Sequence, residues 1–288
     1  MTIFRCPICE KRLNKQEEIY KCEENHSYDI AKEGYVHLLP PNKMHSKIPG
    51  DNKQMVSSRR RFLETGLYEL FSDKLNEIVK EYANTENPVI LDAGCGEGYY
   101  TGRLQNKLTE NGLNPQIFGF DISKFAIKAA SKKYKDIDFA VGSIFNIPVM
   151  NCCADIVIDV FAPIVESELN RVLKPKGYLI LAVPGVRHLY GMKEILYEAP
   201  YENEYKKTEY EGFEFLKRIP VKDDIVITDN QTIVDLFTMT PYYYKTGVDG
   251  GQRLKETERL KTHIEFDFLI YKKRSEERRV GKECRSRW

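Results

Sequence analysis

Apolar residues follow two different spacings along this chain, and the spacings alternate between residues 88 and 184. Short continuous apolar runs are typical of buried parallel strands, whereas apolar residues three or four positions apart are typical of amphipathic helices. Their alternation predicts the α/β class, with a doubly wound, Rossmann-like sheet and right-handed crossovers. The runs predict strands at Val89–Ala93, Ile117–Asp121, Phe139–Val141, Ala154–Val160 and Tyr178–Val183.

Helical spacing occurs between these runs and on both sides of them. One long helix is expected before the first strand, at Met55–Tyr82, and later strands at Phe213–Val221, Ile225–Thr228 and His263–Tyr271 complete the sheet. A segment rich in proline, glycine and lysine, Pro40–Lys53, is expected to be a linker. The predicted division is a small unit at 1–40, a linker and helical segment at 41–87, and the main domain at 88–272. Other helices are expected at Tyr99–Leu108, Lys124–Tyr134, Val165–Leu173 and Asn230–Thr240.

The first predicted strand leads into a glycine-rich turn that indicates a ligand-binding loop. Asp92 precedes Gly94, Gly96 and Gly98, and a helical stretch follows. Glycine permits positive φ and close approach of a ligand, and the helix start offers unpaired amides. The spacing is G-x-G-x-G, not the G-x-G-x-x-G of dinucleotide-binding folds.

Two carboxylates make this loop more informative. Asp92 could face a cationic amine, and Asp121, at the end of the second predicted strand, could accept hydrogen bonds from both hydroxyls of a ribose. The combination resembles the S-adenosylmethionine site of class I methyltransferases. A Rossmann-like domain for a different nucleotide is the alternative.

The first forty residues contain a metal-binding pattern. Cys6 and Cys9 are two residues apart, and Cys22 and His26 form a second pair. Three thiolates and one imidazole suit tetrahedral zinc, and four protein ligands leave no open position, so the metal is expected to be structural. His37 is a possible competing ligand but lies in an alternating, strand-like run. The alternative is a set of buried free cysteines with a surface histidine.

Composition indicates a cytoplasmic protein with no membrane partner. The 288 residues contain no apolar run of the length of a membrane span, and the amino terminus lacks the apolar stretch of a signal peptide. Seven cysteines, an odd number, argue for a reducing compartment rather than a disulfide framework. The segment 273–288 is strongly basic and aperiodic and contains the single tryptophan. We interpret it as a non-native or disordered tail; a basic arm for RNA is the alternative.

With both patterns in hand, the chain resembles the RlmA family of methyltransferases over about residues 3–272. The resemblance implies S-adenosylmethionine-dependent methylation of guanine N1 in a hairpin loop of 23S ribosomal RNA, by a homodimer. It also implies that the four metal ligands hold zinc and that Tyr68, Gly96, Glu97, Asp121 and His188 touch or flank the cofactor. The matching stretches are 6–9, 26–35, 49–51, 59–60, 92–101, 121–124, 184–189 and 239–241.

The chemistry at the acceptor is less defined by the sequence. Phe161-Ala162-Pro163 follows the fourth strand, without the Asn/Asp-Pro-Pro-Tyr of amino methylases of adenine and cytosine. No residue is identified as the base that removes the N1 proton, although Asp159 and His188 lie near strand ends. Arg59-Arg60-Arg61 could follow phosphates or form an ordinary solvated helix face. The alternative functions are methylation of a small molecule such as a quinone and non-catalytic, zinc-dependent RNA binding.

Overall fold

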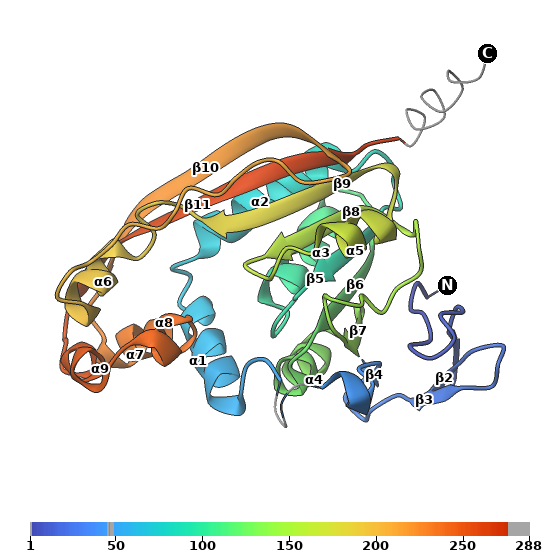
Figure 1. The fold of residues 1–288 in the computed structure, drawn as a ribbon, viewed down its shortest axis with the longest axis horizontal. Helices are drawn as coiled ribbons and strands as arrows, with labels where there is room; N and C mark the ends of the chain where they lie inside the picture. Colours follow the sequence, from blue (N-terminus) through green and yellow to red (C-terminus); the bar gives the residue numbers. More distant parts are fainter. Residues whose placement is uncertain (1, 45, 47–48, 276–288) are drawn as a thin grey trace, which may run out of the picture.

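The computed structural model describes residues 2–44, 46 and 49–275, and it contains an eight-stranded sheet in this part of the chain (Figure 1). Most of the segment interpreted above as a tail, 276–288, lies outside the described residues. In spatial order the strands are β10 (Phe213–Ile227), β11 (Leu260–Lys273), β9 (Leu173–Pro184), β8 (Ala154–Val160), β5 (Val89–Ala93), β6 (Gln116–Asp121), β7 (Asp138–Val141) and β4 (Val36–His37).

Six neighbouring strands, from β4 to β9, are parallel, whereas β11 is antiparallel to β9 and β10 is antiparallel to β11. After edge strand β4, the chain enters the centre of the parallel sheet at β5, continues outward through β6 and β7, and then returns to the other side of β5 with β8. The strand order therefore reverses between β5 and β8, which is where doubly wound sheets bind ligands, beyond the carboxyl ends of the strands. The predicted fold class is confirmed.

Helices cover one face of the sheet, and the amino-terminal unit (residues 1–40) helps to cover the other. The helices of the first face are α2 (Glu69–Tyr82), α3 (Tyr99–Glu110) and α4 (Lys124–Lys133), whose apolar residues pack with Ile90 and Ile156. On the opposite face, α5 (Glu166–Val172) shares a core with the amino-terminal unit. Phe4 of that unit meets Phe118 of β6 edge to face, with ring centroids 5.7 Å apart.

The amino-terminal unit is a small antiparallel sheet that is also joined to the main one. It consists of β1 (Asn14–Gln16), β2 (Ile19–Lys21) and β3 (Ser27–Asp29), paired in that order. Immediately afterwards β4 pairs in parallel with β7, Val36 with Ala140 and His37 with Val141. A short 3₁₀ helix at Pro41–Lys43 follows within the expected linker. His37 is therefore a strand residue, as its alternating run indicated.

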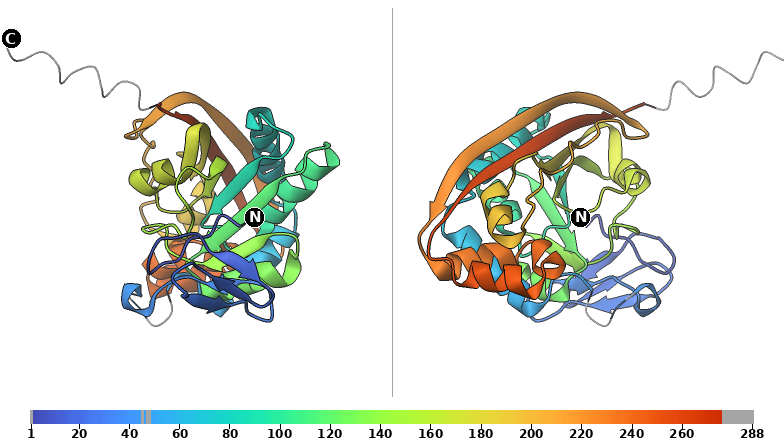
Figure 2. Two further views of the ribbon diagram at one scale, coloured as in Figure 1. Left: turned by 90° about the vertical axis from the view of Figure 1, so that its right-hand side faces the viewer. Right: turned by 60° about the vertical axis from the view of Figure 1, so that its left-hand side comes forward.

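The remaining helices gather beside the edge at which β8 and β9 end (Figures 1 and 2). The contacts between α1 and α7, between α6 and α9, and between α7 and α9 hold this group together. The group consists of α1 (Lys53–Glu64), α6 (Tyr190–Leu196), α7 (Asn230–Thr238), α8 (Tyr242–Lys245) and α9 (Val248–Lys255). No helix in the described part of the chain is both long and apolar enough to cross a bilayer.

Two predicted elements are wrong in their extent. The single helix expected at Met55–Tyr82 is two helices, because the chain turns at Gly66, whose φ is +80°. Leu63 and Leu75 are buried on both sides of the turn, so the apolar spacing continues through it and conceals the break. The two strands expected at 213–221 and 225–228 are one strand, β10. Its charged residues 222–224 face solvent, which an edge strand permits.

Candidate functional site

The glycine-rich loop at the end of β5 contains three glycines with positive φ, and they differ in how much space surrounds them. A Cβ on Gly94 would lie 2.6 Å from the Cβ of Ala162, and one on Gly98 would lie 3.0 Å from the ring of Tyr134. Those two positions are glycine because the loop packs tightly against neighbouring elements. At the middle glycine, the nearest atom to an added Cβ is 3.7 Å away. The φ values are 84° for Gly94, 57° for Gly96 and 82° for Gly98.

Asp121, at the end of β6, fixes this loop from the neighbouring strand. Its Oδ2 accepts a hydrogen bond from the amide of Gly96 at 3.0 Å, and its Oδ1 accepts one from the amide of Ser123 at 2.7 Å. Burial raises the pKa of Asp121, and the two backbone donors oppose that shift by favouring the carboxylate. Each carboxylate oxygen has a further lone pair, so Asp121 can still accept hydrogen bonds from a ligand's hydroxyls.

Asp92 lies in β5, one strand away, and one of its oxygens is unsatisfied. The hydroxyl of Thr101 donates to Oδ2 at 2.6 Å, whereas Oδ1 is buried with no hydrogen-bond partner among the described residues. Only 1% of Asp92 is exposed, and burial raises its pKa to about 7. A buried carboxylate oxygen without a donor is costly, and a cationic amine placed beside it would remove that cost.

Glu97 is oriented toward α1 rather than toward Asp121. It is 2% exposed, and burial raises its pKa to about 7, a shift that Arg60 opposes most strongly. The Nε of Arg60 lies 3.5 Å from Glu97 Oε2. Glu97 therefore attaches α1 to the glycine loop, and so flanks the loop without facing the carboxylates.

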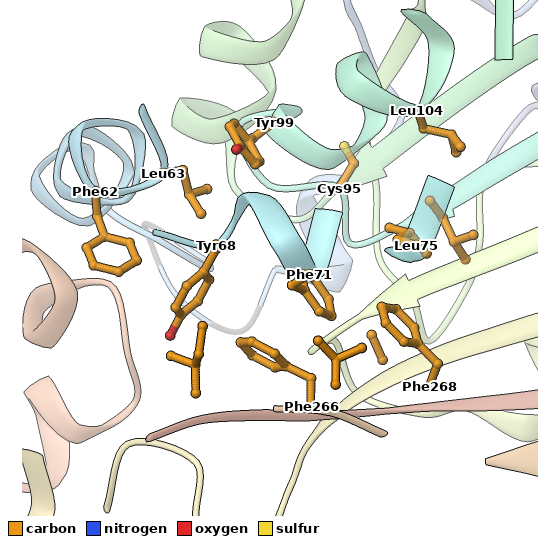
Figure 3. Packing of buried hydrophobic residues seen from close by; sticks show 14 of the residues in the cluster. Phe62, Leu63, Tyr68, Phe71, Leu75, Cys95, Tyr99, Leu104, Phe266 and Phe268 are labelled. Carbon is orange, nitrogen blue, oxygen red and sulfur yellow. The ribbon is translucent and has the colours of Figure 1, made fainter. Parts of the chain in front are cut away.

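Tyr68 and His188 are the other two predicted cofactor neighbours. Tyr68 belongs to the apolar cluster of Figure 3, and the His188 ring lies 6.2 Å from the Tyr68 ring. Tyr68 meets Phe62 and Phe266 edge to face, at centroid distances of 4.9 and 5.1 Å, and its buried hydroxyl has no hydrogen-bond partner in the described part of the chain. His188 packs on Phe266 at 4.5 Å. Burial lowers the pKa of His188 to about 3, so this imidazole is neutral at physiological pH. The structure thus brings Tyr68 and His188 together, and the glycine loop together with Asp92, Glu97 and Asp121, as two neighbouring groups.

The contact between the two groups runs through aromatic rings. Phe71 of α2 meets Tyr100 of α3 edge to face at 5.1 Å, directly after the glycine loop, and it also packs on Phe266 at 4.4 Å. Neither Phe71 nor Thr101 was singled out by the sequence. The spacing of Thr101 from Asp92 is the signal that identifies it, since the first turn of the helix after a glycine loop returns beside the strand end.

The three arginines of α1 all make contacts within the protein, and whether they also follow phosphates stays a prediction. Arg61 makes two hydrogen bonds to the buried carboxylate of Asp235 in α7, at 2.7 and 2.5 Å. Arg59 pairs with Asp51 and also donates to the carbonyl of Met239 at 3.0 Å. Together with the pair between Arg60 and Glu97, these contacts attach α1 to three separate segments.

The second site is the cysteine and histidine cluster of the amino-terminal unit. Its four donor atoms all lie within 4.8 Å of one another. Cys6 Sγ and Cys22 Sγ are each 3.5 Å from the Nδ1 of His26, and Cys9 Sγ is 3.6 Å from Cys22 Sγ. Ligands about 2.0–2.3 Å from a tetrahedral zinc ion are separated by roughly 3.3–3.8 Å. The geometry and the donor set therefore fit zinc in a closed, structural site.

Comparison with known proteins assigns both regions. Residues 4–47 match the model of the RlmA amino-terminal zinc ribbon, and residues 84–240 match that of a methyltransferase domain. A Bacillus subtilis protein that carries the name 23S rRNA (guanine-N(1)-)-methyltransferase is 29% identical over 277 residues, 93% of this chain and 96% of the relative.

Two further relatives come from Streptomyces and Micromonospora. The 23S rRNA (guanine(748)-N(1))-methyltransferase of Streptomyces fradiae is 29% identical over 67% of each chain. A Micromonospora griseorubida protein named for the same guanine-N1 reaction is 30% identical, over 65% of this chain and 67% of the relative. The methyltransferase model covers more than half of this chain, and the zinc ribbon that precedes it is the RlmA type. This chain is therefore a methyltransferase of the RlmA family.

Proposed function

We propose that the protein transfers a methyl group from S-adenosylmethionine to N1 of a guanine in a hairpin loop of 23S ribosomal RNA. The observation that carries the proposal is the joint placement of Asp92 and Asp121 on either side of a glycine loop, in a chain that also has the RlmA zinc ribbon. Relatives named for this reaction match the chain over both regions, which supports the choice of acceptor.

The residues at the sheet edge fit the cofactor. The unpartnered Oδ1 of Asp92 suits the ammonium group of the methionine part, and Asp121 suits the ribose hydroxyls. Gly96 allows backbone approach, and Gly94 and Gly98 maintain the shape of the loop. In this proposal Glu97, Tyr68 and His188 flank the cofactor. When bound, S-adenosylmethionine supplies a methyl group already activated by its sulfonium charge.

The protein's own contribution is then mainly binding and orientation. Placing the acceptor nitrogen in line with an activated methyl replaces a bimolecular encounter by a local one. Guanine N1 is engaged when the base is paired, so a loop position or a flipped base is the suitable substrate. Asp159, the second-last residue of β8, is buried, and its Oδ2 has no partner among the described residues. His188 is neutral, and its Nδ1 accepts a hydrogen bond from the amide of Glu265 at 3.3 Å.

The zinc ribbon serves RNA recognition in this proposal, and zinc holds its fold. We propose the boundaries 1–40, 41–87 and 88–272 for the ribbon, the connecting segment and the methyltransferase domain. In that division β4 belongs to the ribbon by sequence and to the large sheet by pairing. Homodimer formation and residence in the cytoplasm complete the proposal.

Primer extension on ribosomal RNA tests the function, because N1-methylguanine stops reverse transcriptase. RNA from a strain lacking the gene should lose one stop, and the wild-type gene should restore it. A gene with Asp121→Ala should not restore it. If every stop is present in both strains, the RNA substrate is contradicted. Methylation of extracted small molecules, but not RNA, would support the quinone alternative, and failure to bind S-adenosylmethionine would support a non-catalytic role.

A further inference from the structure

The residue directly after β8, Phe161, has an unusual backbone conformation. Its φ is +63°, in the left-handed region that bulky residues rarely adopt because Cβ crowds the following carbonyl. Its amide nevertheless donates to the carbonyl of Ala182 in β9 at 3.1 Å, so the conformation is held by the sheet. Strain that surrounding structure maintains is concentrated at functional sites.

The conformation leaves the ring of Phe161 half-exposed on a rigid support. Its ring is stacked on Phe71, with centroids 5.6 Å apart and planes at 21°, and lies 5.5 Å from Phe266. Phe71 and Phe266 are fully buried, whereas Phe161 is 44% exposed. Of these three packed rings, Phe161 is the one with a free surface.

The position of this ring relative to the glycine loop is fixed by its neighbour. Ala162 is the residue whose Cβ would meet a Cβ on Gly94 at 2.6 Å, so the turn after β8 touches the glycine loop. The amide of Ala162 also donates to Asp159 Oδ1 at 3.0 Å, which fixes the turn. β8 and β5 are the strands between which the strand order reverses, and ligands of such sheets lie beyond their carboxyl ends.

We propose that Phe161 is the base-positioning residue of this enzyme, with its exposed face stacked on the acceptor guanine beside the methyl donor. The inference rests on the proposed function and adds to it a contact for the base. A flat apolar ring provides a surface on which a purine can stack. Such stacking does not distinguish between bases, so Phe161 orients the base while other contacts select it. Two buried rings behind it prevent it from turning away.

The test uses four substitutions in the full-length zinc-loaded protein. Phe161→Ala and Phe161→Gly both remove the ring, Phe161→Tyr keeps it, and Phe215→Ala removes a ring of similar exposure, 39%, near the start of edge strand β10. We measure kcat and KM for methylation of a 23S rRNA hairpin transcript, the dissociation constant of S-adenosylmethionine, and Tm.

The alanine and glycine variants should lose about 10- to 100-fold in kcat/KM for RNA, the range that one base–aromatic stacking contact gives. Most of that loss should be in kcat, because an unoriented base still binds through the rest of the hairpin. Affinity for S-adenosylmethionine should be unchanged, and Phe161→Tyr and Phe215→Ala should retain wild-type rates. The glycine variant should have a higher Tm than the alanine variant, since only glycine relieves the positive φ.

Wild-type kcat/KM in both ring-deleted variants would overturn the inference while leaving the proposed function intact. An equal loss in Phe161→Tyr, or a parallel loss of S-adenosylmethionine binding, would also overturn it, because the ring would then act through folding. Failure of the wild-type protein to methylate any ribosomal RNA would instead contradict the proposed function itself.

Discussion

The zinc ribbon and the glycine-loop edge of the sheet are both held in place, but by different forces. The strands of the ribbon are three residues long and mostly exposed, and its four ligands supply what a small core cannot. At the other site, four of the five residues of β5 are buried, and the loop after it is maintained by glycine backbone, by Asp121 and by contact with Ala162.

The contrast indicates which perturbation each region should resist. A metal site depends on every ligand, so it fails as a unit, whereas the sheet edge depends on many contacts that each contribute a little. The two regions are also connected, because Phe4 and Leu13 of the ribbon share a core with Leu91 and Val157 of the sheet. The ribbon occupies the place over β6 that a helix usually covers in doubly wound folds.

The largest expected effect is the loss of zinc in Cys22→Ser. Structural zinc contributes roughly 10–16 kcal/mol in zinc-finger peptides, so residues 6–29 should lose their fold. Zinc content should fall well below one ion per chain, and amides of 6–29 should lose protection in hydrogen exchange. Affinity for S-adenosylmethionine should change by less than about threefold, since Asp92 and Asp121 lie on other elements.

Cys152→Ser is the matched control, because Cys152 is exposed and outside the cluster. It should retain both zinc and protection. Loss of S-adenosylmethionine binding together with zinc in Cys22→Ser would show that the shared core makes the two regions one cooperative unit.

A second prediction concerns the pH dependence of Asp92. Its pKa is about 7 in the folded protein against an ordinary value of 3.8, so the folded state binds the proton more tightly than the unfolded chain. The stability that this group contributes is full below pH 4 and is lost as pH rises to 7, by about 4 kcal/mol. Asp92→Asn cannot ionise, so it should exceed the wild type in free energy of unfolding at pH 8 by up to that amount.

The difference in free energy of unfolding between Asp92→Asn and the wild type should also grow by about 1 kcal/mol from pH 6 to pH 8. Urea unfolding without S-adenosylmethionine measures it, and calorimetric titration should show weaker cofactor binding by the variant. Glu97→Gln is the comparison, because Glu97 has a similar pKa but faces Arg60. Equal losses of cofactor affinity in both variants would contradict a special role for Asp92.

Asp121→Ala should weaken binding of S-adenosylmethionine about 100-fold, or roughly 3 kcal/mol. The substitution removes the acceptor for the amides of Gly96 and Ser123 as well as that for the ribose, and hydrogen bonds to charged groups contribute about 1.5–3 kcal/mol each. Calorimetric titration checks it. Asp138→Ala, which removes a carboxylate paired with Lys15 of the ribbon, should leave the dissociation constant unchanged.

The smallest expected effect separates packing from backbone strain in the glycine loop. Gly94 and Gly112 have nearly the same φ, 84° and 80°, but an added Cβ meets Ala162 at 2.6 Å only at Gly94. Both alanine variants should lose about 1–2 kcal/mol to the backbone, and Gly94→Ala should lose about 1–3 kcal/mol more. Equal free energies of unfolding for Gly94→Ala and Gly112→Ala would show that the turn after β8 can shift away from the added Cβ without loss of stability.

Much of this organisation is local and could therefore be predicted from the sequence. Strand β5, the glycine loop and Asp121 follow one another within a single βαβ unit. The carboxyl ends of two adjacent parallel strands lie at the same edge of the sheet, so the sequence alone places the loop beside Asp121. The four metal ligands are likewise determined by two short pairs. The apolar spacing of 55–82 did not reveal the turn at Gly66, because the buried faces of α1 and α2 continue across it.

Other features were decided only by long-range packing. In the sequence the arginine triplet has the pattern of a charged surface, yet two of its acidic partners, Glu97 and Asp235, come from distant segments, and the third, Asp51, lies just before α1. The positive φ of Phe161 and the burial of Tyr68 and His188 depend on β9, β11 and α2 arriving at the same place. Sequence thus determined the metal ligands and the succession of strands along the chain through short-range spacing. The tertiary structure decided which charges are neutralised and which aromatic ring stays exposed, because desolvation depends on every segment that packs around a group.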